Sequence, residues 1–545
     1  MISSRLLVLL ITMLLSTKLY AKACFEIDLP KSPKYTFTDK VYIKSFDGVR
    51  IGANVFEPKS FNPFKTFPVI IFVNSWFLEE HEYFKQAKKF AEKGYIVLSY
   101  SARGWGCSDG LINVIGDNDM KDLSKVIDWI RDHTRADMRN IGMSGISYGS
   151  GMTLRGLAHD SRIKTGVAMS TWGSLTDSLI GNDTLRSFWS ALLVGSAFVS
   201  GDLDTDIWEL LKDILENQGD GEAKKWTELR SPINYVNIIN KRNTPIFMAN
   251  SFGDNLFHAN SVIDFYNKLT VPKRLELNQG THASAEGLGL FYDANYTFDN
   301  VHSWFDYWLK GISPKKKLQE VSILTSVKHQ RESHSQSFFK QENTNTTFYL
   351  SPRRFPFSGK LKRLNTNMET TEDTIRAGVD TLASTGIPLA SVVINSHFKT
   401  PVMRLSYLLN SPYSLIYKSD TLVSDIKLRG IPKLNINITP HSDQVQLVTY
   451  LYDVNPFGVA KLITHGVMTK RNLIPHKDID INLDLVANAY DLKKGHKLTI
   501  VIDTFDLLYL PLIGNSHDFD VNFNKEKSNT LSFFDFKKAR TTYVE

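Results

Sequence analysis

The amino-acid sequence predicts a chain of two folded parts, an α/β domain followed by an all-β domain. Over the first half of the chain, strand-like runs alternate with amphipathic helix patterns, which is typical of a mostly parallel sheet with crossover helices. From about residue 321 onward, helix patterns nearly vanish and short alternating runs replace them. A glycine- and lysine-containing run at 311–317 reads as the linker between these two regions.

Length and composition allow a large folded core. The chain has 545 residues, 42% of them hydrophobic, which is enough for two to four domains. Its formal charge is +7, and removal of the first 23 residues, which hold Arg5, Lys18 and Lys22 but no acid, would leave about +4. A surplus this mild gives no reason to expect a nucleic-acid partner.

The N-terminus has the pattern of a secretory signal peptide. Arg5 precedes an apolar run at 6–15, and Ala21-Lys22-Ala23 supplies small residues around a cleavage site. We therefore predict a signal peptide at 1–23 and export to the periplasm or the medium. A short membrane anchor and lipoprotein processing at Cys24 are the alternatives, disfavoured by the length of the run and by Lys22. No later stretch is long enough to predict a membrane span in the mature protein.

Cys24 and Cys107 are the only cysteines. Export to an oxidising compartment permits a disulfide between them, but one pair cannot define a fold. The sequence leaves their pairing open.

The predicted α/β domain covers residues 24–317. It begins with a hairpin of strands at 40–45 and 49–56 around Asp47-Gly48, followed by an almost wholly apolar strand at 67–73. Further strands are predicted at 95–100, 165–169, 245–250 and 274–277, and helices at 83–93, 118–133, 261–269 and 300–309. Residues 176–243 lack strand alternation and are rich in large apolar residues, so we predict a helical cap inserted over the carboxyl edge of the sheet.

The predicted C-terminal domain covers residues 318–545. Its clearest strands are predicted at 321–327, 346–350, 433–438, 445–452 and 497–502. A jelly-roll β-sandwich is the simplest arrangement for them.

Gly145-Ile146-Ser147-Tyr148-Gly149 follows an apolar strand pattern and precedes a helix pattern. This is the arrangement of a nucleophile elbow, in which a serine stands on a strained turn at the end of a strand. Ser147 is the candidate nucleophile, and the surrounding order of elements predicts an α/β-hydrolase domain.

A serine nucleophile needs a base and an acid that orients this base. In α/β-hydrolases the chain order is serine, acid, histidine, with the last two on loops after late strands. Asp254 follows the strand at 245–250, and His282 follows the next strand. We predict Ser147, Asp254 and His282 as the triad; His258 is a second choice as the base, because it precedes a helix.

The oxyanion formed during acyl transfer needs preorganised donors. The backbone N–H of Tyr148, directly after the nucleophile, is one candidate. Trp76, after the strand at 67–73, is the other and could donate through its backbone or its indole N–H. Trp172 and Phe257 are candidate substrate-binding residues. No metal-ligand spacing is found, since His81 and Glu82 are adjacent, so neither a metal nor a cofactor is expected.

Several motifs of the first half carry a family resemblance: Ser101-Ala102-Arg103-Gly104-Trp105-Gly106-Cys107-Ser108-Asp109-Gly110, the elbow, Leu229-Arg230-Ser231-Pro232 and Gly253-Asp254-Asn255-Leu256-Phe257. They resemble the X-prolyl dipeptidyl peptidase and bacterial cocaine esterase family of serine hydrolases. In the C-terminal half, Leu422-Val423-Ser424-Asp425, Tyr450-Leu451-Tyr452-Asp453-Val454 and Gly495-His496-Lys497-Leu498 are similar to the jelly roll of that family. The resemblance implies a capped serine hydrolase with its triad at Ser147, Asp254 and His282.

Two positions depart from the family pattern. Members with a tyrosine hydroxyl in the oxyanion hole carry it where this chain has Trp76. Relatives that hydrolyse α-amino acid esters hold the substrate ammonium with carboxylates just past the catalytic aspartate, whereas here Leu256 and Phe257 follow Asn255. The second departure argues against specificity for a free amine.

The sequence thus predicts an exported serine hydrolase that acts on carboxylic esters or amides through an acyl-enzyme. The substrate would be a small ester, an amide or a short peptide. Two alternatives stay open: an X-Pro dipeptidyl peptidase, and a catalytically silent binding protein that uses the jelly roll. The sequence makes no prediction of oligomeric state.

Overall fold

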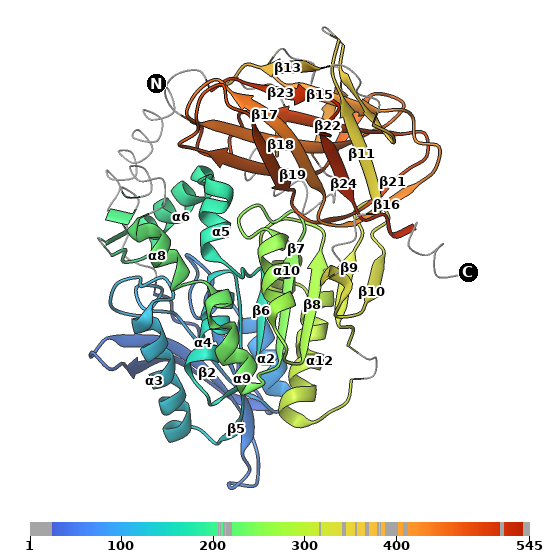
Figure 1. The fold of residues 1–545 in the computed structure, drawn as a ribbon. Coiled ribbons are helices and arrows are strands. Elements are labelled where there is room, and N and C mark those ends of the chain that lie inside the picture. Colours follow the sequence, from blue (N-terminus) through green and yellow to red (C-terminus); the bar gives the residue numbers. More distant parts are fainter. Residues whose placement is uncertain are drawn as a thin grey trace.

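The computed structural model describes residues 24–537 except 205, 208, 211–212, 214–220, 315–317, 341–344, 355–356, 366–369, 379–380, 382, 387–401, 407–412 and 513–516. The predicted signal peptide and the lysines of the predicted linker lie outside the described residues. Figure 1 shows an α/β layer at the blue to green end of the chain and a β-rich domain at the orange to red end. Within the described residues, no helix combines the length and the apolarity needed to cross a membrane.

The α/β domain is built on one ten-stranded sheet in the order β1-β2-β4-β3-β5-β6-β7-β8-β9-β10. Its strands are β1 (Tyr35–Lys44), β2 (Arg50–Pro58), β3 (Phe67–Val73), β4 (Ile96–Tyr100), β5 (Ala136–Ile146), β6 (Ile163–Met169), β7 (Ile246–Ser251), β8 (Lys273–Asn278), β9 (Val321–Leu324) and β10 (Arg331–His334). The strands from β4 to β9 in this order are parallel to one another, while β1, β2 and β10 are antiparallel to their neighbours. This is the α/β-hydrolase architecture that the strand and helix pattern predicts.

Helices cover both faces of this sheet. They are α2 (Phe84–Glu92), α3 (Asp117–His133), α4 (Tyr148–His159), α9 (Val236–Arg242), α10 (Ala259–Lys268), α11 (Ser284–Phe291) and α12 (Tyr296–Lys310). Alternate residues of β3 belong to different cores: Val69 and Ile71 join the core of α3, α4 and α10, whereas Ile70 and Phe72 join that of α2 and α12. A strand covered on both faces must be apolar throughout, which explains the unbroken hydrophobic run of β3.

The segment after β6 is helical, as predicted for 176–243. It contains α5 (Leu175–Ile180), the 3₁₀ turn η1 (Gly181–Asp183), α6 (Ser187–Ser200), α8 (Glu222–Glu228) and η2 (Pro232–Tyr235) before α9. The end of the segment differs from the prediction, because α9 packs against α4 and its Ile239 belongs to the core of the sheet. It is the crossover helix between the neighbouring parallel strands β6 and β7, and only the part before it forms a cap.

The end of the α/β sheet also differs from the prediction. The sequence predicts a strand of the C-terminal domain at 321–327, but β9 pairs in parallel with β8, and β10 extends the same sheet to His334. The α/β sheet therefore continues past the predicted boundary after residue 317. The sequence pattern of a short alternating strand is the same in both domains. Only the pairing of β9 with β8, after the α12 crossover, shows which sheet it belongs to.

The C-terminal domain is all-β, as predicted. Its strands are β11 (Thr346–Ser351), β12 (Gly359–Lys362), β13 (Thr371–Ile375), β14 (Met403–Leu405), β15 (Leu415–Ser419), β16 (Ile426–Gly430), β17 (Lys433–Pro440), β18 (Val445–Val454), β19 (Val459–Lys470), β20 (Ile479–Asp484), β21 (Asn488–Leu492), β22 (Lys497–Asp503), β23 (Phe519–Phe523) and β24 (Thr530–Phe533), with a 3₁₀ turn η3 (Phe338–Lys340) before them. All but β16 and β21, which pair with each other, belong to one twelve-stranded sheet. These strands enclose a hydrophobic core of their own. The jelly-roll topology stays a prediction.

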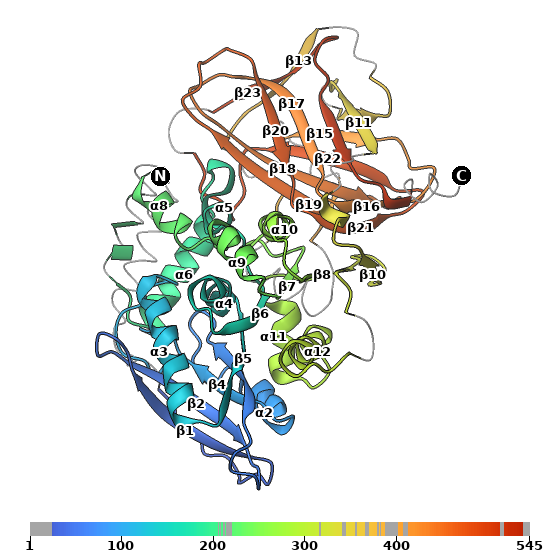
Figure 2. The ribbon, with the colours of Figure 1, turned by 60° about the horizontal axis from the view of Figure 1, so that its bottom comes forward.

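The two domains meet along a seam made by the cap and α10. The side-chain amide of Asn182 donates to the carbonyl of Val467 at 3.0 Å, and Thr184 Oγ1 lies 2.8 Å from Thr469 Oγ1. Asn260, on α10, accepts from the backbone N–H of Ala487 at 2.7 Å. Figure 2 shows α5 and α10 directed toward the β-rich domain.

A disulfide joins Cys24 to Cys107, which settles the pairing that the sequence leaves open. Its Cα atoms are 4.7 Å apart, although 83 positions separate the cysteines in the chain. The bond ties the segment before β1 to the loop after β4. By closing a long loop, it restricts the unfolded chain, an effect typically worth about 2–4 kcal/mol.

Candidate active site

Ser147 stands on a sharp turn between β5 and α4. Its backbone is left-handed, with φ 54° and ψ −118°, a conformation that costs a non-glycine residue on the order of 1–3 kcal/mol. The flanking glycines make the turn possible: a Cβ at Gly145 would lie 2.4 Å from the carbonyl carbon of Gly149, and one at Gly149 would lie 2.3 Å from the carbonyl oxygen of Val73. The elbow motif thus reflects two close backbone approaches.

Ser147, His282 and Asp254 form a hydrogen-bonded chain. His282 Nε2 lies 2.8 Å from Ser147 Oγ, and His282 Nδ1 lies 2.8 Å from Asp254 Oδ2. An ionised carboxylate only accepts hydrogen bonds, so Nδ1 carries the proton and Nε2 presents its lone pair to the hydroxyl. Asp254 is fixed in turn, because its Oδ1 accepts from the N–H groups of Leu256 and Phe257 at 3.0 and 2.8 Å.

The electrostatic surroundings favour the protonated form of His282. Burial of the imidazole acts to lower its pKa, but the charge of Asp254 and the hydrogen bond to it outweigh burial and raise the pKa, with a further contribution from Glu286. An imidazole stabilised as a cation is suited to receive a proton from serine.

Glu286 is a buried carboxylate that the sequence analysis did not single out. It lies on α11, and its Oε1 accepts from Ser170 Oγ at 2.5 Å, while Ser170 Oγ accepts from the N–H of Ala283 at 2.9 Å. Burial raises the pKa of Glu286 to about 7. Through Ser170, Glu286 therefore holds Ala283, the residue next to His282. The sequence contains a signal for this role, because an acid lies four residues after the predicted base.

The candidate oxyanion donors differ in whether they already donate a hydrogen bond within the protein. The indole Nε1–H of Trp76 points to α6, where it lies 3.0 Å from the carbonyl of Leu193 and 3.2 Å from Ser196 Oγ. By contrast, the backbone N–H groups of Trp76 and Tyr148 donate to no group among the described residues. Of the two options that the sequence left for Trp76, the backbone is the one available to a substrate.

A second buried carboxylate holds the loop of Trp76. Glu82 lies 2.6 Å from both the N–H and the hydroxyl of Ser75, whose hydroxyl is also 3.0 Å from the carbonyl of Ile146. Burial raises the pKa of Glu82 to about 7. The residue before Trp76 is thereby linked to the residue before Ser147.

His258, the alternative base in the sequence, contacts neither Ser147 nor Asp254. Its Nε2 lies 3.3 Å from the carbonyl of Asp177. The order of elements, rather than closeness in sequence to Asp254, indicated the histidine that meets the serine.

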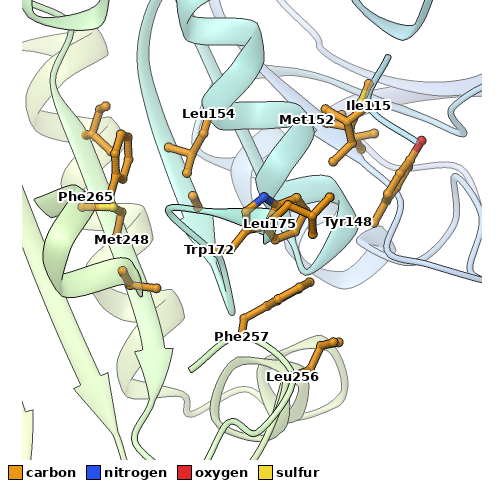
Figure 3. Close-up of a cluster of buried hydrophobic side chains, with 14 of the residues drawn as sticks. Ile115, Tyr148, Met152, Leu154, Trp172, Leu175, Met248, Leu256, Phe257 and Phe265 are labelled. Atoms are coloured by element: carbon orange, nitrogen blue, oxygen red, sulfur yellow. The ribbon is translucent and has the colours of Figure 1, made fainter. Parts of the chain in front are cut away.

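An apolar cavity of about 120 Å³ lies above Ser147. Trp76, Trp172 and Phe257 line it together with cap residues from α5, α6 and α8. The rings of Trp172 and Phe257 are 4.4 Å apart, and Figure 3 shows Phe257 directed toward Trp172 and Leu175. Phe257 also places its ring edge on His282, with centroids 5.0 Å apart.

A second cavity, of about 520 Å³, adjoins the first and is acidic. The two share Val114, Ile207, Leu210 and Trp226 as lining residues. The carboxylates that line the second cavity are Asp204, Asp206, Glu209, Asp213 and Glu222, against one cation, Arg230. The pocket region therefore has an apolar part next to the serine and an acidic part beyond it.

One group of residues in the described part of the chain has the spacing of metal ligands. Ligand atoms of Glu79, Glu80 and His81 lie within 4.8 Å of one another. However, both ring nitrogens of His81 are 2.8 Å from carboxylates, those of Glu79 and Asp39. Although burial opposes it, these contacts raise the pKa of His81 to about 9, and a protonated imidazole has no lone pair for a metal.

Two family models match the chain. Residues 47–284 match the X-Pro dipeptidyl-peptidase (S15 family) model, and residues 314–545 match the X-Pro dipeptidyl-peptidase C-terminal non-catalytic domain. The first match contains the whole serine, aspartate and histidine constellation.

Individual relatives are distant. A protein of Streptomyces avermitilis, named provisionally as an Xaa-Pro dipeptidyl-peptidase, is 22% identical over 246 residues, which are 41% of this chain and 35% of that protein. The chain spans 35–39% of the length of the curated relatives it matches.

Two solved structures share the fold along nearly the whole chain. A CocE/NonD family hydrolase from Staphylococcus aureus has a TM-score of 0.70 at 14% identity, covering 92% of this chain and 94% of its own. An α-amino acid ester hydrolase also has a TM-score of 0.70, at 13% identity, covering 95% of this chain and 99% of its own.

The position of the Trp76 indole leads to a test. We expect Trp76→Phe to lower kcat for p-nitrophenyl butyrate by less than about tenfold, because the backbone N–H remains. Loss of a true oxyanion donor typically costs about 100- to 1000-fold. Ser196→Ala, which removes one acceptor of the indole, is the control for cap packing. A folded Trp76→Phe enzyme with kcat reduced about 100-fold at unchanged KM would instead assign the indole to the oxyanion hole.

Proposed function

Since this chain belongs to the X-prolyl dipeptidyl peptidase and bacterial cocaine esterase family of serine hydrolases, we propose that it cleaves carboxylic esters or amides through an acyl-enzyme on Ser147. The observation that carries the proposal is the continuous hydrogen-bonded chain from Asp254 through His282 to Ser147 beneath an apolar cavity.

The proposed reaction follows from the positions of these atoms. Ser147 Oγ attacks the substrate carbonyl carbon as its proton passes to His282 Nε2, and Asp254 stabilises the resulting imidazolium. The backbone N–H groups of Tyr148 and Trp76 bind the oxyanion. The imidazolium then protonates the leaving alcohol or amine, leaving an ester on Ser147. Water, deprotonated by His282, attacks that ester, releases the carboxylic acid and restores the serine hydroxyl.

The apolar cavity supports an apolar acyl group of limited size. An apolar cavity of about 150 Å³ accommodates a benzene molecule, so a cavity of about 120 Å³ suits an acyl group of roughly four or five carbon atoms. Trp172 and Phe257 would contact such a group. Short-chain esters are therefore the substrate class that fits best.

Removal of the nucleophile tests this function. We expect Ser147→Ala to lower kcat for p-nitrophenyl butyrate by about 10⁴-fold or more, since loss of a triad member leaves only oxyanion and binding effects. A fluorophosphonate should label the wild-type protein and not the variant. Ser303→Ala on α12 is the matched control and should retain full activity. A Ser147→Ala protein with wild-type activity would refute the proposal, and an unlabelled, inactive wild type would favour the alternative of a silent binding protein.

A dipeptidyl peptidase activity is the second candidate, and the acidic cavity favours it. A peptidase that counts residues from the N-terminus must bind the substrate ammonium, and the carboxylates of Asp206 and Glu209 line a space that opens beside the acyl cavity. The family model has the same activity in its description. Against it, Leu256 and Phe257 supply no carboxylate next to Asp254.

Paired substrates separate the two candidates. If the protein is an esterase, kcat/KM is higher for p-nitrophenyl butyrate than for Ala-Pro-p-nitroanilide. N-acetylation of the peptide then changes the rate of its slow cleavage by less than about threefold. If the second is right, acetylation abolishes cleavage, and Asp206→Asn/Glu209→Gln lowers kcat/KM for the free amine alone. We expect the first result; a free-amine peptide cleaved faster than any ester would overturn it.

We further propose that the protein is exported with residues 1–23 removed. The disulfide between Cys24 and Cys107 supports this, because disulfides persist in oxidising compartments. It also argues against lipoprotein processing, since a cysteine sulfur bonded to a lipid cannot form a disulfide.

The mature N-terminus tests export. Protein isolated from the periplasm or the medium should have the intact mass of a chain that begins at Cys24, less two hydrogen atoms. Alkylation should modify neither cysteine before reduction and both afterwards. A lipid-modified Cys24, or recovery only from the reducing cytosol with both thiols free, would contradict the proposal.

A further inference from the structure

A cavity of about 490 Å³ lies at the seam between the two domains. The cap and α10 form one wall with Asp177, Arg186 and His258, and the β-rich domain forms the other with Lys433, Val467 and Tyr509. None of its lining residues lines the two cavities near Ser147. Figures 1 and 2 show α5 and α10, which belong to the first wall, on the side of the α/β domain that meets the β-rich domain.

Arg186 is the unusual residue of this cavity. Only 5% of its surface is exposed. Its Nη1 donates to the carbonyls of Asp177 and Ser178, both at 2.9 Å, but its Nε has no hydrogen-bond partner. Within the described residues, no carboxylate lies within 4.0 Å of its guanidinium, unlike the buried Arg103 and Arg429, which are each paired with acids. A buried charge without a counter-charge is costly, so arginine is rarely buried unpaired.

The side chains around Arg186 do not supply the missing negative charge. Burial, together with the positive charge of Arg186, lowers the pKa values of His258 and His465 to about 3. Both imidazoles are therefore neutral, and His465 Nε2 is occupied by the hydroxyl of Tyr509 at 2.7 Å. The carboxyl groups on the cavity rim, Asp177, Asp264 and Asp484, are solvent-exposed, and Asp264 is paired with Lys268.

Two further polar atoms on the wall are unpartnered. His258 Nε2 faces the carbonyl of Asp177 and so carries the hydrogen, which leaves Nδ1 as a buried acceptor without a donor. Asn267 Oδ1, on α10, is also a buried acceptor without a partner. The wall thus offers a buried guanidinium, over the Tyr509 ring but without a carboxylate, and two acceptors; Lys433 adds a second positive charge at the other wall. This set complements a group that carries both a negative charge and an O–H.

We propose that this interdomain cavity is a binding site for a small oxyanion, a carboxylate or a phosphate, held by Arg186. One oxygen of the ligand would accept from the guanidinium, and a hydroxyl or protonated oxygen of the same ligand would donate to His258 Nδ1. The ligand supplies the counter-charge that the described residues do not, and it binds between surfaces contributed by both domains. Its occupancy therefore stabilises their docking.

Thermal unfolding of the full chain tests the site. Protein freed of oxyanions is titrated with inorganic phosphate, acetate or lactate, at ionic strength held constant with chloride. We expect a saturable increase in Tm of about 3 °C at roughly a hundred times Kd, because a ligand that binds only the folded state stabilises it by mass action. A larger effect of lactate than of acetate would assign the second contact to a hydroxyl, and an effect of phosphate alone would assign the site to phosphate.

Arg186→Gln should unfold at a Tm that no longer depends on these anions. Arg139→Gln, at an exposed position on β5, removes the same charge and should retain the increase. If Arg186→Gln does not fold, Arg186→Lys is the alternative variant. It preserves the charge but removes the planar guanidinium, so it should raise the apparent Kd about tenfold or more. Equal increases in all three proteins, or no saturable increase above chloride in the wild type, would overturn the proposal.

Discussion

The left-handed backbone of Ser147 is the constraint on which the rest of the site depends. The turn forces α4 back across the end of the sheet, so that backbone atoms of Gly149 lie where a side chain at Gly145 would be, while Gly149 itself lies against Val73. Such a conformation persists only when its surroundings determine it fully. Here β5 is buried between β3 and β6, and Ser147 N–H donates to Met169 at 2.9 Å, so the sheet itself holds the strained residue.

Buried carboxylates fix the loops around this turn. Asp254 orients His282, Glu286 holds Ala283 through Ser170, and Glu82 holds Ser75 against the strand of the elbow. Asp254 contacts the proposed base itself, whereas Glu286 and Glu82 hold Ala283 and Ser75, the sequence neighbours of His282 and Trp76. Burying a carboxylate is unfavourable unless it is paired or hydrogen-bonded. The pKa values of about 7 for Glu82 and Glu286 reflect that burial.

The sequence predicted the features that depend on local order along the chain. Strand and helix alternation predicted the α/β sheet, and the order of Ser147, Asp254 and His282 indicated three side chains that meet although 135 positions separate Ser147 from His282. What it could not predict depends on pairing between distant segments. The strand β9 looks like any short strand, α9 looks like a cap helix, and the Cys24–Cys107 bond requires that the N-terminal segment return to the loop after β4. The indole of Trp76 has a partner only because α6 lies above it.

Helix α6 connects three parts of the molecule that sequence analysis treats separately. From its middle, Leu193 and Ser196 accept the indole N–H of Trp76, so the helix contacts the proposed oxyanion loop. Near its start, the ring of Trp189 lies roughly perpendicular to that of His282, with centroids 5.9 Å apart, and its indole N–H donates to Asn255, next to Asp254.

The residues at the beginning of α6 face the other domain. The N–H of Phe188 donates to the carbonyl of Leu508 at 3.4 Å, and Arg186 precedes the first turn within the interdomain cavity. A rigid helix transmits a displacement along its length, since its hydrogen bonds lie within the segment. The helix that contacts the β-rich domain at its start is therefore the same helix that contacts the loop of Trp76 and the ring of His282. Docking of the two domains and the packing around Ser147 share α6 as a common element.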